Sequence, residues 1–102
     1  MLLNAFERIT LLQILPGEGD IATLLIVKEL ADNLGFTEEE HKTLKLRTEG
    51  TQLHWDISAD TPKEIEIGPA ALATIQEHLK KRSDTKKLTI TQVPLYTRFM
   101  KE

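Results

Sequence analysis

The sequence predicts one α+β domain over residues 1–102, in which helices pack on a small antiparallel sheet. Apolar residues recur at helical spacing on both sides of a central stretch, residues 44–57, in which they alternate with polar residues as in a strand. The middle of that stretch is Gly50-Thr51, a pair suited to the two-residue II′ turn of a β-hairpin. A chain of 102 residues buries roughly two thirds of its unfolded surface, which suffices for one core.

Three helices are predicted before the hairpin, and the first two are separated by a loop. The first covers Asn4 to Leu15 and ends at Pro16-Gly17. The second begins at Ile21 after Asp20, whose carboxylate suits an N-cap, and ends before Gly35, for which we expect a left-handed C′ conformation. The second helix is apolar around so much of its circumference that we expect it to be the central buried helix.

A short third helix is predicted over about Glu38 to Thr43. Thr37 and Glu40 have the spacing of a capping box, in which each side chain accepts a hydrogen bond from the other residue's backbone N–H. Three consecutive acids also suit the positive end of the helix dipole.

The hairpin register follows from the turn and the hydrophobic pattern together. With Gly50-Thr51 as the turn, one face carries three pairs: Thr48 with Leu53, Leu46 with Trp55 and Leu44 with Ile57. The other face pairs Lys45 with Asp56 and Arg47 with His54. We expect the first face, with the single tryptophan, to belong to the core.

The C-terminal third is predicted to hold two helices. Glu64 to Ile67 alternates, so it is either a third strand of the sheet or an extended lead-in. Pro69 suits the first position of a helix with a buried stripe at Leu72, Ile75 and Leu79. Residues 86–93 fit strand, loop or helix, and we expect a closing helix capped by Thr91.

The segment from Leu30 to Thr37, with His41 and Leu44, resembles the helix-turn-helix of bacterial regulators. With the following hairpin, this resemblance implies a winged-helix-like fold and places Thr37, Glu38, Glu39, Lys42 and Thr43 on the side that would face a DNA groove. Two of these are carboxylates, which oppose the electrostatic attraction that dominates nucleic-acid affinity. A helix-turn-helix used for packing is therefore the favoured interpretation, and a nucleic-acid-binding regulator is the alternative.

Under that alternative, six basic residues would contact nucleic acid: Arg47, Lys80, Lys81, Arg82, Lys86 and Lys87. Five of them surround the end of the fourth helix, where cations also complement the helix dipole. The formal net charge of −3 gives no global attraction for nucleic acid or anionic lipid.

The sequence predicts neither an enzyme nor a metal or cofactor site. Glu38 and His41 have a Glu-x-x-His spacing, but a di-iron site requires a second such motif and further helical glutamates. Both serines lie in expected loops without a neighbouring base, and Gly17-Glu18-Gly19-Asp20 lacks the lysine of a phosphate-binding loop. The absence of cysteine, of a secretory pattern and of a membrane-spanning apolar run predicts a cytoplasmic protein without membrane association.

Several scattered motifs also make the chain similar to a family of small hypothetical proteins of bacteriophages and prophages. They include Gly35-Phe36-Thr37-Glu38-Glu39-Glu40-His41, Trp55-Asp56 and Leu95-Tyr96. The resemblance implies a phage-associated setting and supplies no catalytic residue. We therefore expect a non-catalytic module that binds another protein or itself, as in a homodimer. The candidate contact residues are Glu38, Glu39, Lys42, Tyr96, Phe99 and Met100.

Overall fold

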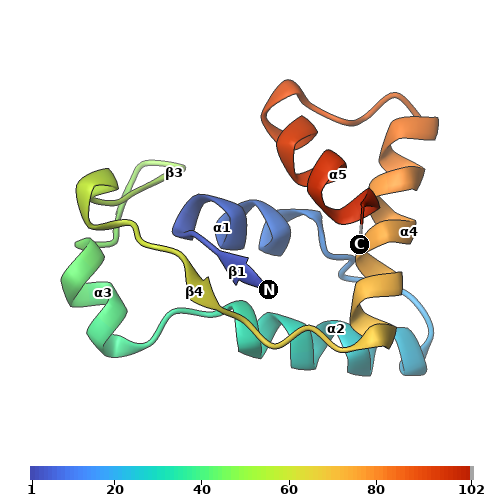
Figure 1. Ribbon diagram of the computed structural model, residues 1–102, viewed down its shortest axis with the longest axis horizontal. Helices are drawn as coiled ribbons and strands as arrows, with labels where there is room; N and C mark the ends of the chain where they lie inside the picture. The colour runs from blue at the N-terminus through green and yellow to red at the C-terminus, as the bar shows by residue number, and fades with distance from the viewer. Residues whose placement is uncertain (102) are drawn as a thin grey trace.

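The computed structural model of the protein describes residues 1–101 and is an α+β structure. Its helices are α1 (Ala5–Ile14), α2 (Ile21–Leu34), α3 (Glu38–Leu44), α4 (Pro69–Asp84) and α5 (Val93–Met100), with short 3₁₀ turns η1 (Ile57–Ala59) and η2 (Ile90–Gln92). The strands are β1 (Leu2–Leu3), β2 (Arg47–Glu49), β3 (Gln52–His54) and β4 (Lys63–Glu64). Figure 1 shows α1, α2, α4 and α5 packed together, with α3 and the hairpin at one end.

The helix starts follow the predicted capping chemistry. Asp20 accepts a hydrogen bond from the N–H of Thr23 at 2.8 Å, and Thr37 and Glu40 form the predicted capping box. Pro69 opens α4 after Gly68, as predicted. The C-terminus of α2 differs from the prediction, because Gly35 has φ −60° and ψ 161°, an extended conformation that leads directly into α3.

The hairpin has the predicted turn and register but is shorter than predicted. Arg47 lies opposite His54, Thr48 opposite Leu53 and Glu49 opposite Gln52, and Gly50 has φ +64°, as the first position of a II′ turn requires. The prediction that Leu44 pairs with Ile57 is wrong. Leu44 is the last residue of α3, and the chain then turns through a left-handed Lys45 before the strand begins.

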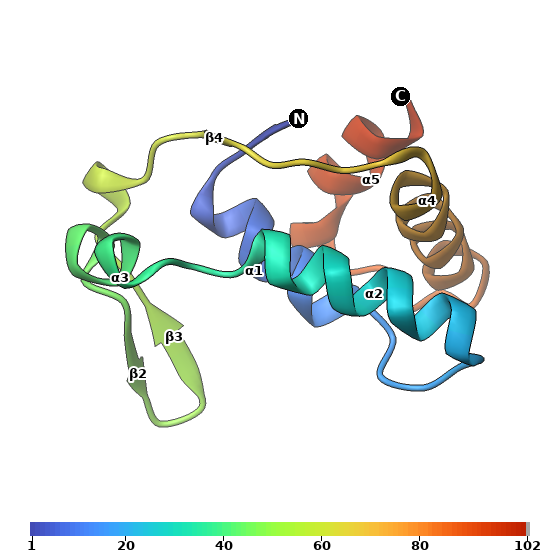
Figure 2. The same ribbon diagram turned by 90° about the horizontal axis from the view of Figure 1, so that it is seen from below.

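The apolar face of the hairpin is not core, contrary to the prediction. Ile57 is 79% exposed and Leu53 is 39% exposed, and Trp55 is half-buried against Phe6, with the two ring centroids 6.4 Å apart. The hairpin projects beside the helices instead of lying flat on them (Figure 2), so only its base is covered.

The predicted third strand, which the structure places at β4, does not pair with the hairpin. Leu2 lies opposite Glu64 and Leu3 opposite Lys63, so β1 and β4 form a separate two-stranded sheet. This ribbon brings Leu3 and Ile65 into the core. The period-two pattern at Glu64 to Ile67 indicated an extended segment correctly, but no local pattern specified that its partner comes from the start of the chain.

The core lies between the four packed helices and the β1–β4 ribbon. Its buried residues are Leu3, Leu11, Ile14, Leu30, Leu34, Ile65, Ile75, Leu79, Leu95 and Phe99. The expectation that α2 is the central buried helix is wrong for its first half, because Ile21 and Leu25 are exposed while Leu30 and Leu34 are buried.

Residues 86–93 form a loop that leads into η2 and the start of α5. The prediction that Thr91 caps the closing helix is wrong: the N-cap of α5 is Gln92, whose side chain makes no cap hydrogen bond to α5. Gln92 instead completes a cap of η2, in which the Thr89 N–H donates to Gln92 Oε1 at 3.2 Å. Pro94 follows Val93, the first residue of α5, where its missing N–H breaks no helical hydrogen bond. Two apolar residues of α5, Leu95 and Phe99, are therefore part of the chain's own core.

We expect Gly50→Val to destabilise the protein by about 1–2 kcal/mol, because a β-branched residue is strained at positive φ. Urea unfolding measures the change in free energy. Gly17→Val is the matched control, since Gly17 has no positive φ and a Cβ atom added to it would meet no other atom within 4 Å. Equal stability of Gly50→Val and wild type would contradict the II′ turn.

Candidate functional site

A buried arginine connects α1 to the end of α2 and to α3, next to the candidate sites. Arg8, on α1, is 2% exposed. Its Nε donates to the Leu34 carbonyl at 3.0 Å, and its Nη2 donates to the Gly35 carbonyl at 2.5 Å. Arg8 therefore satisfies the carbonyls that α2 leaves without helical partners where it ends.

The same guanidinium reaches α3. Arg8 Nη1 donates to Glu40 Oε2 at 2.5 Å, and the guanidinium carbon lies 4.0 Å from the centre of the Phe36 ring. Glu40 also accepts a hydrogen bond at 3.1 Å from Nζ of Lys63, the first residue of β4. One charge cluster thus connects α1, the α2–α3 junction and β4.

This cluster lowers the pKa of Glu40 from its ordinary value of 4.5 to about 2. The main cause is the hydrogen bond from Arg8, followed by smaller favourable contributions from the Thr37 backbone and Lys63. Because the pKa is lowered in the folded state, Glu40 contributes stability above pH 4.5, and this contribution is lost as the pH falls toward 2.

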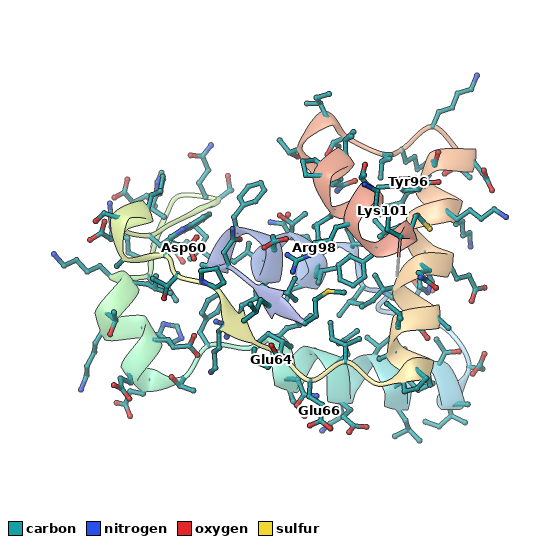
Figure 3. All side chains as sticks on the ribbon, in the orientation of Figure 1. Asp60, Glu64, Glu66, Tyr96, Arg98 and Lys101 are labelled. Atoms are coloured by element: carbon teal, nitrogen blue, oxygen red, sulfur yellow. The ribbon has the colours of Figure 1, made fainter. Side chains whose placement is uncertain are left out.

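Asp60 makes a second connection, between the base of the hairpin and α1. Its Oδ1 accepts from the Ala5 N–H at 2.6 Å, and its Oδ2 accepts from Trp55 Nε1 at 3.3 Å. Figure 3 places Asp60 beside the N-terminal end of α1. Asp60 therefore fixes the tryptophan ring over the first turn of α1, next to Phe6.

A polar cleft of about 440 Å³ lies between α1, α3 and residues 59–63. Its charged groups are those just described, Arg8, Glu40, Asp60 and Lys63, together with Glu39. Four of these five are held by hydrogen bonds within the protein. The cleft is thus built mainly from groups that maintain the fold.

A second hollow, of about 320 Å³, lies between α1, β3 and η2, and we call it the β3 groove. Its apolar lining is Phe6, Ile9, Leu53 and Trp55, and each of its polar lining residues is a threonine or a glutamine. Among residues 1–101, no charged side chain lines it, although charged residues make up 28% of the chain. Phe6 and Leu53 are 42% and 39% exposed, so two large apolar side chains face solvent in one hollow.

The predicted partner-binding residues fall into two separate groups. Glu38, Glu39 and Lys42 are exposed on α3. Phe99 is buried in the core with 0% exposure, so its side chain presents no surface, and Tyr96 and Met100 are only partly exposed beside it. Near them, Arg98 points from α5 toward the N-terminal part of the chain (Figure 3), where it donates to Glu7 Oε2 at 2.5 Å and to the Leu2 carbonyl.

The six basic residues considered for nucleic acid also lie apart. Arg47 is on β2 and pairs with Glu49, with 3.2 Å between Nε and Oε1. The remaining five lie at the C-terminal end of α4 and just after it. Figure 1 shows that end of α4 at the opposite side of the molecule from α3 and the hairpin, so the fold forms no continuous basic surface from them.

The residues of the β3 groove were only partly identified from the sequence. Trp55 stood out as the single tryptophan, but Leu53 was expected on the buried face of the hairpin, and Phe6 was not singled out from the other apolar residues of the first helix. Their exposure depends on how far the hairpin stands from α1, which no local pattern specifies. No sequence signal separates Phe6, which is followed by Glu7 and Arg8, from the buried residues of its helix, whereas Leu53 lies between two polar residues of the hairpin.

The chain matches no protein-family model, and it matches neither a curated protein nor a solved structure. Within residues 1–101, no helix has the length and apolar character needed to cross a bilayer. The same residues contain no group of three histidine or carboxylate side chains placed to hold a metal ion.

We expect Arg8→Met to destabilise the protein by about 2–4 kcal/mol, because it leaves Glu40 and two helix-end carbonyls without their donor. Lys28→Met is the control. It removes an exposed ion pair to Asp32 on α2, and such a pair contributes about 0.5 kcal/mol or less. Urea unfolding at pH 7 compares the two, and similar losses would show that Arg8 has no special structural role.

Glu40→Gln tests the lowered pKa. Glutamine keeps the capping position but does not ionise, so we expect the variant to be less stable than wild type at pH 7. The difference should shrink by about 1–2 kcal/mol between pH 5 and pH 2, after allowance for solvent screening. Thermal unfolding across this range measures it, with Glu39→Gln as the exposed control. A pH-independent difference would contradict the assignment.

Proposed function

We propose that the protein is a non-catalytic protein-binding module and that the β3 groove is its binding site. The uncharged lining of the groove is the observation that carries this proposal. Protein interfaces are depleted of charge at their centres and enriched in aromatic side chains. The groove combines these properties with amide and hydroxyl groups that can pair with a partner's backbone.

The two aromatic residues of the groove are held by contacts within the protein, which favours binding. Asp60 fixes Trp55 by its hydrogen bond, and the Phe6 ring lies on the first turn of α1 against the tryptophan. A side chain that is already ordered loses little conformational entropy when a partner binds. By contrast, the exposed Ile21 and Leu25 lie on one helix face outside the groove lining.

The order of three helices followed by a hairpin supports the winged-helix-like resemblance and, with it, the alternative of nucleic-acid binding. This alternative has weaker support because Glu38 and Glu39 occupy the exposed start of α3 and the basic residues are divided between two ends of the molecule. A phage or prophage setting, implied by sequence resemblance, is compatible with either proposal.

Photo-crosslinking in cells that express the protein tests the proposed site. Benzoylphenylalanine replaces Phe6 in the groove or, as control, Leu25, which is 59% exposed on α2. We expect a discrete protein adduct from position 6 and none from position 25. We also expect Gln52→Lys to remove the adduct, because it brings a charge to the uncharged groove.

The mass of the adduct identifies the partner. A mass equal to two copies of the chain would indicate self-association, and a different mass would indicate another protein. The absence of an adduct from position 6, or equal adducts from both positions, would contradict the assignment of the groove as the binding site.

A further inference from the structure

The β3 strand has a free backbone edge beside the groove. Glu49 and Gln52 flank the two-residue turn and therefore exchange the first pair of hairpin hydrogen bonds. The next pair, Thr48 and Leu53, is then a non-hydrogen-bonded pair, because the two kinds of pair alternate in an antiparallel ladder. The N–H and C=O of Leu53 consequently point away from β2, toward the free edge of β3.

The two edges of the hairpin differ in how they are protected against further pairing. The β2 edge carries Arg47 and Glu49, and charged residues on an edge strand discourage the addition of another strand. The three residues of β3 include no lysine, carboxylate or proline, and Leu53 lies at their centre. Figure 2 shows β3 as the strand nearer to the helices and β2 as the outer strand.

The side chains along this edge match the needs of an added strand. Thr51, Leu53 and Trp55 alternate along the chain and line the groove together with Phe6 from α1, and the intervening Gln52 contributes a polar group to the same lining. A strand laid along β3 would place every second side chain against this apolar surface. A charged side chain entering the groove would lose hydration without an opposite charge to replace it.

We propose that the β3 groove binds an extended partner segment without charged side chains, which adds to β3 as a third strand. This inference rests on the proposed function and specifies the chemistry of the partner. The backbone of Leu53 supplies affinity through hydrogen bonds to the partner backbone, and Phe6, Leu53 and Trp55 select alternating apolar side chains.

A phage-displayed library of random peptides, selected on the wild-type protein, supplies the probe. We expect the selected peptides to lack charge and to alternate apolar residues. Each is then synthesised and titrated against the protein, with fluorescence of Trp55, the single tryptophan, as the signal. Leu53→Pro removes the outward N–H of β3 without removing a hairpin hydrogen bond and should raise Kd about tenfold or more.

Thr48→Pro is the matched control, because it removes the corresponding outward N–H from the β2 edge. It should leave Kd within about twofold of wild type, a difference well under 1.4 kcal/mol. Hydrogen exchange on the wild-type protein gives a second measurement that requires no folded variant: bound peptide should slow exchange of the Leu53 amide and leave that of Thr48 unchanged.

Three outcomes would overturn strand addition: a library that yields no groove-dependent peptide, peptides that bind Leu53→Pro as tightly as wild type, or a Leu53 amide unprotected by bound peptide. These outcomes are distinguishable from failure of the proposed function. If the adduct from position 6 persists in the Leu53→Pro variant, the groove is still a protein-binding site. The partner then does not bind by adding a strand to β3.

Discussion

The structure depends on one buried cation. Arg8 is inside the protein, where an unpaired charge would be very costly, so the surrounding elements must supply acceptors. They are the carbonyls at the end of α2 and the carboxylate of Glu40 on α3. The planar fork of the guanidinium contacts both groups at once, as a lysine ammonium could not. The position of α3 relative to α1 follows from this requirement.

The place of α3 in turn positions the hairpin. The chain leaves α3 through a left-handed Lys45, and the hairpin returns to α1 through Asp60, which bonds both Trp55 and the first turn of α1. The hairpin is therefore held at its base, while its strands stand away from the helices. The groove beside β3 and the exposure of Phe6 and Leu53 are consequences of this arrangement.

The sequence predicted local structure well, but it predicted poorly which apolar residues are buried and which are exposed. Capping at Asp20 and Thr37, the proline start of α4 and the turn at Gly50 depend on interactions within a few residues, so each was predicted correctly. The burial of Phe99 and the exposure of Leu53 depend on distant elements. An apolar stripe indicates that a face avoids water but not which part of the chain covers it.

The amino-acid sequence by itself determined the α+β class, the helix starts at Asp20, Thr37 and Pro69, and the register of the hairpin next to its turn, because these follow from periodicity, caps and turn chemistry. Only the tertiary structure decided that β4 pairs with β1, that Arg8 is buried and that the hairpin stands beside α1. Those features join residues more than twenty positions apart. Since the candidate binding site lies where such elements meet, its residues became apparent only in the folded chain.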